Sequence, residues 1–431
     1  MIALPAAFAV PVAANDRLGP NSVTYLTHST VIDDPGVYVL RTDISASDGD
    51  GLTVTADDVT ILGAGHSLVG SPEAGSAITA DGVSNLHVEG VSITGWWNGL
   101  TFADVDGVTL TGVHISNASG DGVRLSESTD VTFAAGSVVG STGHGVVVTT
   151  GRDITVSEST LSDNGGHGIA MRDSRASTVH ASTITDNGGV GIRVDSVPER
   201  APARASLPFW MIPLYGDVPV DVLAEFFGQS SDGVDSQALV VTNNTISDNR
   251  YEGVLLVGAT GGTIANNTVA NATDGIHLYS VSWAAVTGNT ISGSTDDGIA
   301  LSRVNDSTIS GNTMVDNRND GLYLFGDRNA LLDNTASKNG DDGIDVDSGA
   351  DNRIEANAAY NNGDDGVFVR EANVNIVIGN DLRNNADDGI DLRGATGNSV
   401  NNNTVCGSTD RDVQIRQGVV GNDVHDNNES C

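Results

Sequence analysis

The sequence predicts an all-β fold, a right-handed single-stranded parallel β-helix whose solenoid has about fourteen coils of 22–23 residues. Three observations support this prediction. A short sequence motif that begins with glycine recurs at a fixed period, and each period contains three short apolar runs. The composition is rich in glycine (53 of 431 residues) but only 4% aromatic. Such a chain suits a solenoid, because each coil buries its apolar face only against its neighbours.

The repeat is marked by a glycine followed by apolar–x–apolar, in words such as GVRL, GVVV, GIAL and GIDV. Alternation with a period of two is typical of a short strand. The spacing is 23 residues in the first half of the chain and 22 or 23 in the second. The glycines are Gly99, Gly122, Gly145, Gly168, Gly191, Gly253, Gly275, Gly298, Gly321, Gly343, Gly366 and Gly389. Each word predicts the first strand of one coil.

Two further short strands complete each period, and the third follows an asparagine in words such as NTI and NTV. This asparagine recurs in coil after coil, at Asn244, Asn267, Asn289, Asn312, Asn334, Asn357, Asn380 and Asn403. Stacked asparagines hydrogen-bond side chain to side chain along the axis of a β stack. We therefore predict an asparagine ladder at one turn of the solenoid.

The predicted organisation has four parts. Residues 1–14 are apolar, end in small residues and are interpreted as the remains of a secretory signal. Residues 15–50 are expected to cap the open end of the stack, 51–406 to form the β-helix and 407–431 to cap its other end. Cys406 and Cys431 are expected to form a disulfide, and two unpaired thiols are the alternative interpretation. No stretch is long enough for a transmembrane helix. The signal-like residues 1–14 lead us to expect a secreted or cell-surface protein.

The period is interrupted by an inserted loop at 196–238. The distance from Gly191 to Asn244 is 53 residues, against 14 from Gly253 to Asn267, so about 39 residues are inserted. The insert is rich in proline and aromatic residues. Loops of this size without a role are uncommon. A flap packed on the solenoid wall, a lid over a groove and an oligomer contact remain alternative interpretations.

The chain is strongly acidic, with a formal net charge of −36 and a pI of about 4.2. Aspartate dominates the acidic residues, and Lys338 is the single lysine. Such a chain repels itself at low salt and is screened at high salt. This composition is typical of proteins from halophiles, and it disfavours binding to nucleic-acid phosphates.

Candidate substrate-binding residues lie at the outward positions of the first strands. On the other two strands these positions are mostly small or polar, but here they combine aromatic rings, carboxylates and guanidinium groups. Rings stack on sugars, and arginine pairs bidentately with uronate or sulfate groups. The candidates are His277, Tyr279, Tyr323, Phe325, Phe368, Arg370, Arg393, Arg172 and Arg193. Ordinary solvated side chains are the alternative interpretation.

Three aspartates on this predicted face are candidate catalytic residues. Strand geometry places Asp345 about 7 Å from Asp347 and about 9–10 Å from Asp391. These distances lie near the ~6.5–9.5 Å that separates the two carboxylates of an inverting glycosidase. If the protein is an enzyme, we expect a polysaccharide hydrolase or lyase.

A second acidic column precedes the repeat glycine. Stacked carboxylates repel one another unless they are screened or bridged, and Ca²⁺ binds all-oxygen sites of this kind. A cation ladder is therefore one interpretation, and turn capping by each aspartate in high salt is the other. The candidate metal ligands are Asp297, Asp320, Asp342, Asp365 and Asp388.

The stretch from Pro35 to Ser71, with PGVYVL followed by DGLTVTADDVTILGAGHSLVGS, resembles the start of NosD-type domains. The whole chain resembles the carbohydrate-binding and sugar-hydrolase type of β-helix, which includes NosD-type periplasmic proteins, mannuronan C5-epimerases and pectin-degrading enzymes. The resemblance implies a β-helix and, for NosD relatives, a part in copper-site maturation. The words GHG and DDGIAL are similar to polygalacturonase words but occur in reversed order, so no catalytic role is transferred from them.

Three functions follow as expectations. The first is a secreted or surface protein that binds, and in one version processes, an acidic polysaccharide along the first-strand face. The second is a non-catalytic adhesin or viral spike-type structural protein. The third is a NosD-like accessory factor in copper-enzyme maturation.

Overall fold

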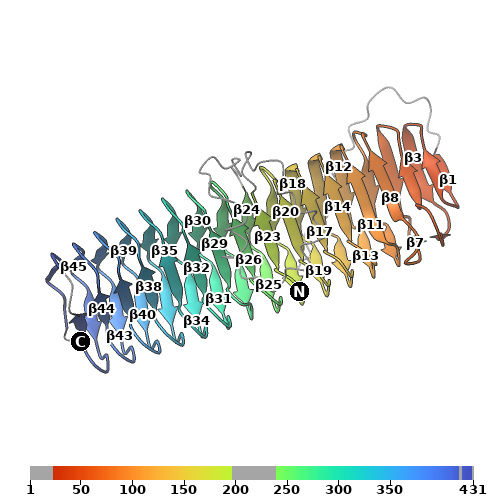
Figure 1. The fold of residues 1–431 in the computed structure, drawn as a ribbon. Helices are drawn as coiled ribbons and strands as arrows, with labels where there is room; N and C mark the ends of the chain where they lie inside the picture. Colours follow the sequence, from red (N-terminus) through yellow and green to blue (C-terminus); the bar gives the residue numbers. More distant parts are fainter. Residues whose placement is uncertain (1–22, 197–238, 417–419, 430–431) are drawn as a thin grey trace, which may run out of the picture.

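The computed structural model describes residues 23–196, 239–416 and 420–429. Within these ranges the chain is all β, and the strands pair in parallel to form three sheets of 17, 16 and 15 strands. Figure 1 shows the coils stacked along one axis, with the sequence running steadily from one end of the stack to the other. The predicted parallel β-helix of about fourteen coils is thereby confirmed.

Each coil contributes one strand to sheet B, then one to sheet A, then one to sheet C. Sheet B contains the predicted first strands. Its members are β2 (Thr30–Ile32), β5 (Leu52–Val54), β8 (Ser76–Asp81), β11 (Asn98–Ala103), β14 (Val123–Ser126), β17 (Val146–Thr149), β20 (Ile169–Arg172), β23 (Ile192–Asp195), β26 (Val254–Val257), β29 (Ile276–Tyr279), β32 (Ile299–Ser302), β35 (Leu322–Phe325), β38 (Ile344–Asp347), β41 (Val367–Arg370), β44 (Ile390–Arg393) and β47 (Val413–Ile415).

Sheet A follows sheet B in each coil. Its strands are β1 (Val23–Leu26), β3 (Gly36–Leu40), β6 (Val59–Leu62), β9 (His87–Glu89), β12 (Asp106–Thr111), β15 (Thr129–Ala134), β18 (Arg152–Ser157), β21 (Thr178–His180), β24 (Val240–Thr242), β27 (Thr263–Ala265), β30 (Ala285–Thr287), β33 (Thr308–Ser310), β36 (Ala330–Leu332), β39 (Arg353–Glu355), β42 (Ile376–Ile378), β45 (Ser399–Asn401) and β48 (Asp423–His425).

Sheet C closes each coil. Its strands are β4 (Ile44–Ser45), β7 (Ser67–Val69), β10 (Ser92–Thr94), β13 (His114–Ser116), β16 (Ser137–Val139), β19 (Thr160–Ser162), β22 (Thr183–Thr185), β25 (Thr245–Ser247), β28 (Thr268–Ala270), β31 (Thr290–Ser292), β34 (Thr313–Val315), β37 (Thr335–Ser337), β40 (Ala358–Tyr360), β43 (Asp381–Arg383) and β46 (Thr404–Cys406).

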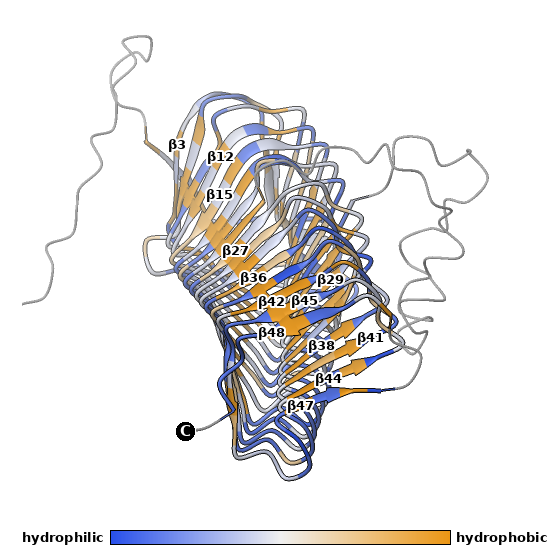
Figure 2. Ribbon diagram, turned by 90° about the vertical axis from the view of Figure 1, so that its left-hand side faces the viewer, coloured by the Kyte–Doolittle hydropathy of each residue, from blue (hydrophilic) through white to orange (hydrophobic). Residues whose placement is uncertain are grey.

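The core is a set of apolar columns that run along the axis. Alternate residues of each strand point inward, as in β38, where Ile344 and Val346 are fully buried. Figure 2 shows hydrophobic residues concentrated in the strands and hydrophilic ones in many of the turns. The repeat glycine belongs to this packing, because a Cβ on Gly343 would lie 2.6 Å from the carbonyl oxygen of Gly366 in the next coil. Glycine is thus required at this position because successive coils approach each other closely.

The predicted asparagine ladder is confirmed at the turn between sheets A and C. The Nδ2 of Asn334 donates to Oδ1 of Asn357 at 3.0 Å and to the carbonyl oxygen of Ile309 at 2.8 Å. Two further ladders that the sequence pattern did not predict occupy the other two turns. One includes Asn339 and Asn362, and the other includes Asn352 and Asn375. These bonds satisfy buried backbone groups that the turns leave without strand partners.

The described ends of the stack differ from the predicted caps. Within the expected cap 15–50, β2, β3 and β4 pair in parallel with β5, β6 and β7, so this segment already forms coil. Within 407–431, β47 and β48 pair in parallel with β44 and β45. The prediction was wrong about these boundaries because β2 and β47 lack the glycine word by which coils were recognised.

The insertion appears as a large increase in the sequence separation between paired residues of neighbouring strands. From β23 to β26 the paired residues are 62 apart, against 23 from β20 to β23. Residues 197–238, which hold most of the expected loop 196–238, and the expected signal 1–14 lie outside the described residues. Cys406 ends β46, and its expected partner Cys431 also lies outside the described residues, so the disulfide stays a prediction. None of the described segments is a helix of the length and hydropathy that a membrane span requires.

Candidate functional site

The predicted site residues come together on the outer face of sheet B. Parallel pairing aligns the first outward residue of each strand into one column along the axis. In coil order its members are Arg193, Leu255, His277, Ala300, Tyr323, Asp345, Phe368, Asp391 and Gln414. The neighbouring column contains Tyr279, Phe325, Asp347, Arg370 and Arg393.

A groove with a volume of about 420 Å³ lies on this face. It joins the outward residues of β35, β38, β41 and β44 to the acidic turn that precedes these strands. Its lining residues are Asp296, Asp297, Asn319, Asp320, Tyr323, Asp341, Asp342, Asp345, Asp364, Phe368, Arg370 and Arg393. The groove thus unites members of the predicted substrate-binding, catalytic and metal-ligand sets.

The aromatic residues of this face differ in how accessible they are. Tyr323 is half-buried, and burial together with Asp347 and Asp345 raises the pKa of its hydroxyl to about 12. Phe368 is 7% exposed, and the guanidinium carbons of Arg370 and Arg393 lie 5.5 Å and 4.8 Å from its ring centre. Phe368 therefore holds the two arginines in place, and Tyr323 offers the more open ring.

Tyr279 and Phe325 lie in the second outward column. Tyr279 is buried, and its hydroxyl accepts a hydrogen bond from Arg303 Nη1 at 2.8 Å. Phe325 is partly exposed at the end of β35. Neither residue lines the groove, so the structure places them beside it.

The candidate catalytic aspartates are engaged by arginines. Arg370 Nη2 lies 2.8 Å from Oδ2 of Asp347 and 3.7 Å from Oδ2 of Asp345. Asp345 is 6% exposed, and within the described part of the chain its Oδ1 has no hydrogen-bond partner. Burial raises the pKa of Asp345 to about 7, although Arg370 opposes the shift.

Asp391 is fully buried at the end of the groove-bearing region. Its Oδ2 accepts hydrogen bonds from Arg416 Nε at 2.6 Å and Arg393 Nη2 at 3.2 Å, whereas its Oδ1 has no hydrogen-bond partner among the residues that the structure describes. It lies in the same column as Asp345, two coils further on. The structure therefore brings the three predicted catalytic carboxylates onto one face, with Asp391 closed off by arginines.

Arg172 and Arg193 lie apart from the groove. They line a separate cavity of about 10 Å³ with His144, His167 and Asp195. Arg193 Nε donates to Asp195 Oδ2 at 2.8 Å, and Arg172 Nε lies 4.0 Å from Asp173 Oδ2. Strands β26, β29 and β32 lie between Arg193 and β35, the first strand of sheet B that lines the groove, so the structure does not bring these two arginines to the groove.

The acidic residues before the repeat glycines form a hydrogen-bonded column, here called the acidic ladder. In each member, the side-chain Oδ1 accepts the backbone N–H of the corresponding residue one coil further. The distances lie between 2.8 and 3.1 Å. The members are Asp274, Asp297, Asp320, Asp342, Asp365 and Asp388. Each of these aspartates thus caps a turn through its side-chain oxygen, as the turn-capping interpretation expects.

Burial and mutual repulsion raise the pKa values of the ladder carboxyls. Burial is the largest cause in each, and a neighbouring aspartate adds to it. The pKa rises to about 7 for Asp297, 8 for Asp320, 10 for Asp342, 8 for Asp365 and 6 for Asp388. The groove wall therefore holds carboxyl groups that bind protons far more strongly than free aspartate does.

The same column continues with other residue types toward the N-terminus. Asn98 Oδ1 accepts the N–H of Asp121, and Asp121 Oδ1 accepts that of His144. His144 and His167 follow, with Nδ1 of each accepting the next N–H at 2.8 Å and their rings stacked 4.9 Å apart. Burial lowers the pKa of both imidazoles, which agrees with neutral rings that accept at Nδ1. The recurrence of GHG at the repeat distance was the sequence signal for this role.

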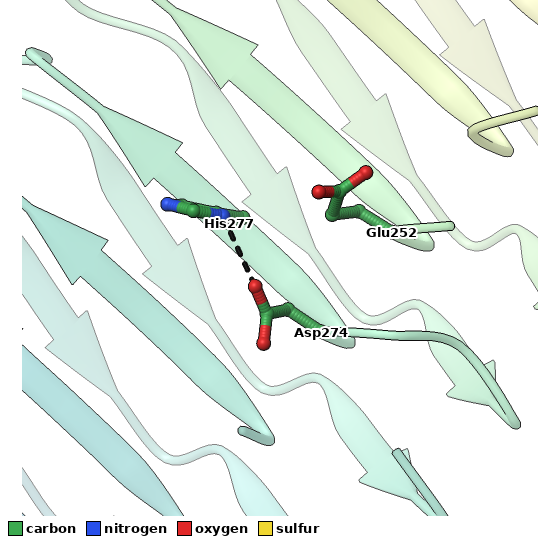
Figure 3. A group of neighbouring side chains, drawn as sticks. All are labelled: Glu252, Asp274 and His277. Atoms are coloured by element: carbon green, nitrogen blue, oxygen red, sulfur yellow. Dashed lines mark ion pairs between the residues drawn. The ribbon is translucent and has the colours of Figure 1, made fainter. Parts of the chain in front are cut away.

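His277 occupies a different position from these ladder histidines. Figure 3 shows it beside Asp274 and Glu252, with the ion pair from His277 Nδ1 to Asp274 Oδ2 drawn between them. That distance is 3.0 Å. The two carboxylates outweigh the effect of burial and raise the pKa of the imidazole. His277 therefore acts as a positive partner of a ladder aspartate and does not line the groove.

The donor set of the groove suits hard cations. Among the described residues that line it there is no His, Met or Cys side chain. Copper prefers imidazole and sulfur ligands, whereas carboxylates suit Ca²⁺ and Mg²⁺. The groove therefore does not fit a copper ion.

Comparisons with known proteins agree with this architecture. The family profile described as "Right handed beta helix region" matches residues 90–201 and 304–431. The profile described as "Periplasmic copper-binding protein (NosD)" matches residues 225–357. No curated protein matches the chain.

Several solved structures are similar to the chain at low sequence identity. The mannuronan C-5 epimerase AlgE6 A-module of Azotobacter vinelandii is 14% identical, with 90% of each chain covered and a TM-score of 0.48. The surface adhesin PfbA of Streptococcus pneumoniae is 11% identical, with 83% of each chain covered and a TM-score of 0.42. Tailspike protein 2 of bacteriophage CBA120 is 12% identical, covers 69% of this chain and 38% of its own, and has a TM-score of 0.38.

The profile matches span more than half of the chain and fall on the regular coils described above. On this evidence, the chain belongs to the right-handed β-helix family.

Proposed function

We propose that the protein binds a polysaccharide outside the cytoplasm, in the groove on the outer face of sheet B. The observation that supports this most directly is the groove itself, which combines the half-open ring of Tyr323 with Arg370 and Arg393 among carboxylates. Aromatic faces and planar guanidinium groups are the side chains that recognise sugar rings and their acidic substituents.

The shape of the surface also favours a polymer. The groove runs across the outward residues of four successive strands, β35, β38, β41 and β44, and the sheet continues beyond it in both directions. Successive strands lie about 4.8 Å apart, so this stretch spans about 14 Å along the axis. An extended glycan has room to lie along such a face, with consecutive sugars over consecutive coils.

Binding can be tested on glycan arrays and then by titration calorimetry. We expect the double variant Arg370→Ala/Arg393→Ala and the single variant Tyr323→Ala to weaken binding of a positive glycan at least tenfold. Matched controls are Arg353→Ala on sheet A, where Arg353 pairs with Glu355, and Tyr360→Ala on sheet C, where Tyr360 is exposed. Equal loss in the controls, or unchanged binding in the groove variants, would remove the proposal.

Hydrolysis of the bound glycan is a second candidate. It is favoured by Asp345, whose pKa of about 7 suits a general acid and which lies two residues from Asp347 on the same strand. Asp345→Asn should then abolish release of reducing ends while the glycan still binds. Release at the wild-type rate by this variant would exclude the acid role of Asp345.

A further inference from the structure

The side chains beside the acidic ladder indicate which kind of partner its carboxylates require. Each ladder residue lies next to the side chain three positions later in the chain, at the first outward position of the following strand of sheet B. In two coils that neighbour is a positive or protonatable group. Arg124 Nη2 contacts Asp121 Oδ2, and His277 Nδ1 lies 3.0 Å from Asp274 Oδ2.

Two other coils place a second aspartate at this position. One is the pair Asp388 and Asp391, and it also receives a positive partner. Arg416 lies between the two carboxylates, with Nη2 3.5 Å from Asp388 Oδ2 and Nε 2.6 Å from Asp391 Oδ2. The ladder therefore acquires a positive partner in this coil too, supplied by a different part of the chain.

The remaining pair is Asp342 and Asp345. Among the described residues, no Arg, Lys or His side chain forms an ion pair with Asp342. The same holds for Asp297, Asp320 and Asp365, but the residues three positions after them carry no carboxyl group, whereas here Asp345 adds a second one. The guanidinium of Arg370 lies 3.7 Å from Asp345 Oδ2 but pairs more closely with Asp347, at 2.8 Å. Asp345 is 6% exposed, and its Oδ1 has no hydrogen-bond partner among the described residues. Two carboxyl groups buried this close together stay ionised only when they are paired or coordinate a metal ion, and otherwise keep a proton.

Further carboxylates surround this pair. Asp341, Asp342 and Asp364 each offer an oxygen, and these oxygens lie within 4.8 Å of one another. Asp345 lines the same groove as these three aspartates. An all-oxygen ligand set of three or four carboxylates suits Ca²⁺, which takes six to eight oxygen ligands and tolerates irregular geometry.

We propose that Asp341, Asp342, Asp345 and Asp364 bind a Ca²⁺ ion in the groove, and that this ion recruits a carboxylate or sulfate group of an acidic polysaccharide. The second half of the proposal rests on the proposed function. Its physical basis is the charge of the groove, whose lining includes seven aspartates and two arginines. An anionic sugar is repelled by such a wall unless a divalent cation bridges the two.

Calcium binding itself is tested on the full chain after treatment with EDTA, at constant ionic strength in KCl. Titration of CaCl₂ should show saturable binding at one site and should raise the midpoint of thermal unfolding. Asp342→Asn should weaken Ca²⁺ binding at least tenfold. This variant keeps an oxygen for the N–H of Asp365, as Asn98 does for Asp121. Absence of saturable binding by the wild-type protein would overturn the proposal.

A matched control is Asp121→Asn, which alters an aspartate in the N-terminal continuation of the same column, where Arg124 is the partner. It should bind Ca²⁺ as the wild-type protein does. If Asp121→Asn loses as much Ca²⁺ binding as Asp342→Asn, the effect belongs to the ladder in general and the proposed site is wrong.

Asp345→Arg is the second variant, because it recreates at coil 342–345 the arrangement of Asp121 and Arg124. We expect it to lose Ca²⁺ binding and to unfold at a midpoint that no longer responds to Ca²⁺ or EDTA. A folded Asp345→Arg protein that still binds Ca²⁺ with wild-type affinity would contradict the proposal. Ligation by Asp345 would also exclude this residue as a general acid.

The glycan half is tested with a polyuronate and a neutral polysaccharide, each in CaCl₂ and in EDTA. Polyuronate binding should require Ca²⁺ and be lost in Asp342→Asn. If Ca²⁺ binds but neither glycan does, the proposed function fails and the metal site stands. If polyuronate binds equally in EDTA, the proposed function stands and the bridging role of Ca²⁺ is refuted.

Discussion

The Oδ1 of Asp297 accepts the backbone N–H of Asp320 at 3.0 Å, across the gap between two successive coils. The same oxygen accepts the side-chain amide of Asn319 at 2.8 Å. One carboxylate thus satisfies two donors at the turn before sheet B. Since this bond repeats down the column, the acidic ladder serves the stability of the fold as well as the chemistry of the groove.

Removing this acceptor should destabilise the stack. Asp297→Ala leaves the N–H of Asp320 and the amide of Asn319 without a partner, and a buried unsatisfied donor costs about 1–3 kcal/mol. Asp297→Asn keeps an oxygen in place and should unfold within about 1 kcal/mol of the wild-type protein at low pH. Thermal unfolding followed by circular dichroism measures both variants, and equal midpoints for Ala and Asn would contradict the role of this oxygen.

The raised pKa of Asp297 predicts that stability falls as pH increases. An aspartate titrates near 3.8 when unfolded, but burial and Asp274 raise the pKa of Asp297 to about 7 in the folded protein. Between these values the folded state binds more protons, so the stabilisation is complete below about pH 4 and is lost as pH rises through 7.

The pH effect is measured as the unfolding midpoint of the wild-type protein and Asp297→Asn from pH 5 to pH 9, without divalent cations. Between pH 5 and pH 7 the difference should change by on the order of 1 kcal/mol per pH unit in favour of the variant, and above pH 7 it should level off. Parallel pH profiles for the two proteins would show that the Asp297 carboxyl is not protonated in the folded state.

The repeat glycine should tolerate no side chain. In Gly343→Ala the new Cβ would lie 2.6 Å from the carbonyl oxygen of Gly366 and 2.6 Å from the Cβ of Ala359. Overpacking of this kind costs about 1–3 kcal/mol, and here the obstacle is backbone that cannot move aside. The variant should unfold at a lower midpoint in denaturant.

A matched control is Gly379→Asn, at a turn where the backbone is left-handed (φ +66°) and nothing lies within 4 Å of the added Cβ. Asparagine accepts this conformation, and Asn402 adopts it at the equivalent turn of the next coil. This control should unfold close to the wild-type midpoint. A larger loss in Gly379→Asn than in Gly343→Ala would refute the packing argument.

Salt should stabilise the protein strongly. The formal net charge of −36 is spread over the solenoid, and the screening length falls from about 10 Å at 0.1 M to about 3 Å at 1 M salt. We expect the unfolding midpoint to rise by on the order of 10 °C between 0.1 M and 2 M KCl.

A variant with fewer exposed charges should respond less to salt. Asp104, Asp163 and Asp333 are exposed and have left-handed backbone that asparagine also adopts. The triple variant to Asn should therefore keep its fold and show a shallower rise of the midpoint with KCl. A steeper rise in this variant would contradict the electrostatic explanation.

The sequence by itself determined the solenoid, its three strands per coil and the columns in which residues align. These follow from a fixed period and a fixed alternation, and a parallel stack adds one equivalent residue to each column per period. This rule alone places Tyr323, Asp345, Phe368 and Asp391 in one column. The repeat glycine failed as a guide only where coils lack it, at Thr30 and Val413.

The depth and pairing of those residues were decided by the tertiary structure alone. Strand periodicity says that Asp391 points outward but not that Arg416 and Arg393 bury it completely. Nor does the sequence show that Asp342 lies beside Asp345, or that Arg370 is shared between Asp345 and Asp347. These relationships depend on the way in which long side chains reach from one coil to the next. The packing of the surface decides this, and the sequence of a single repeat does not show it.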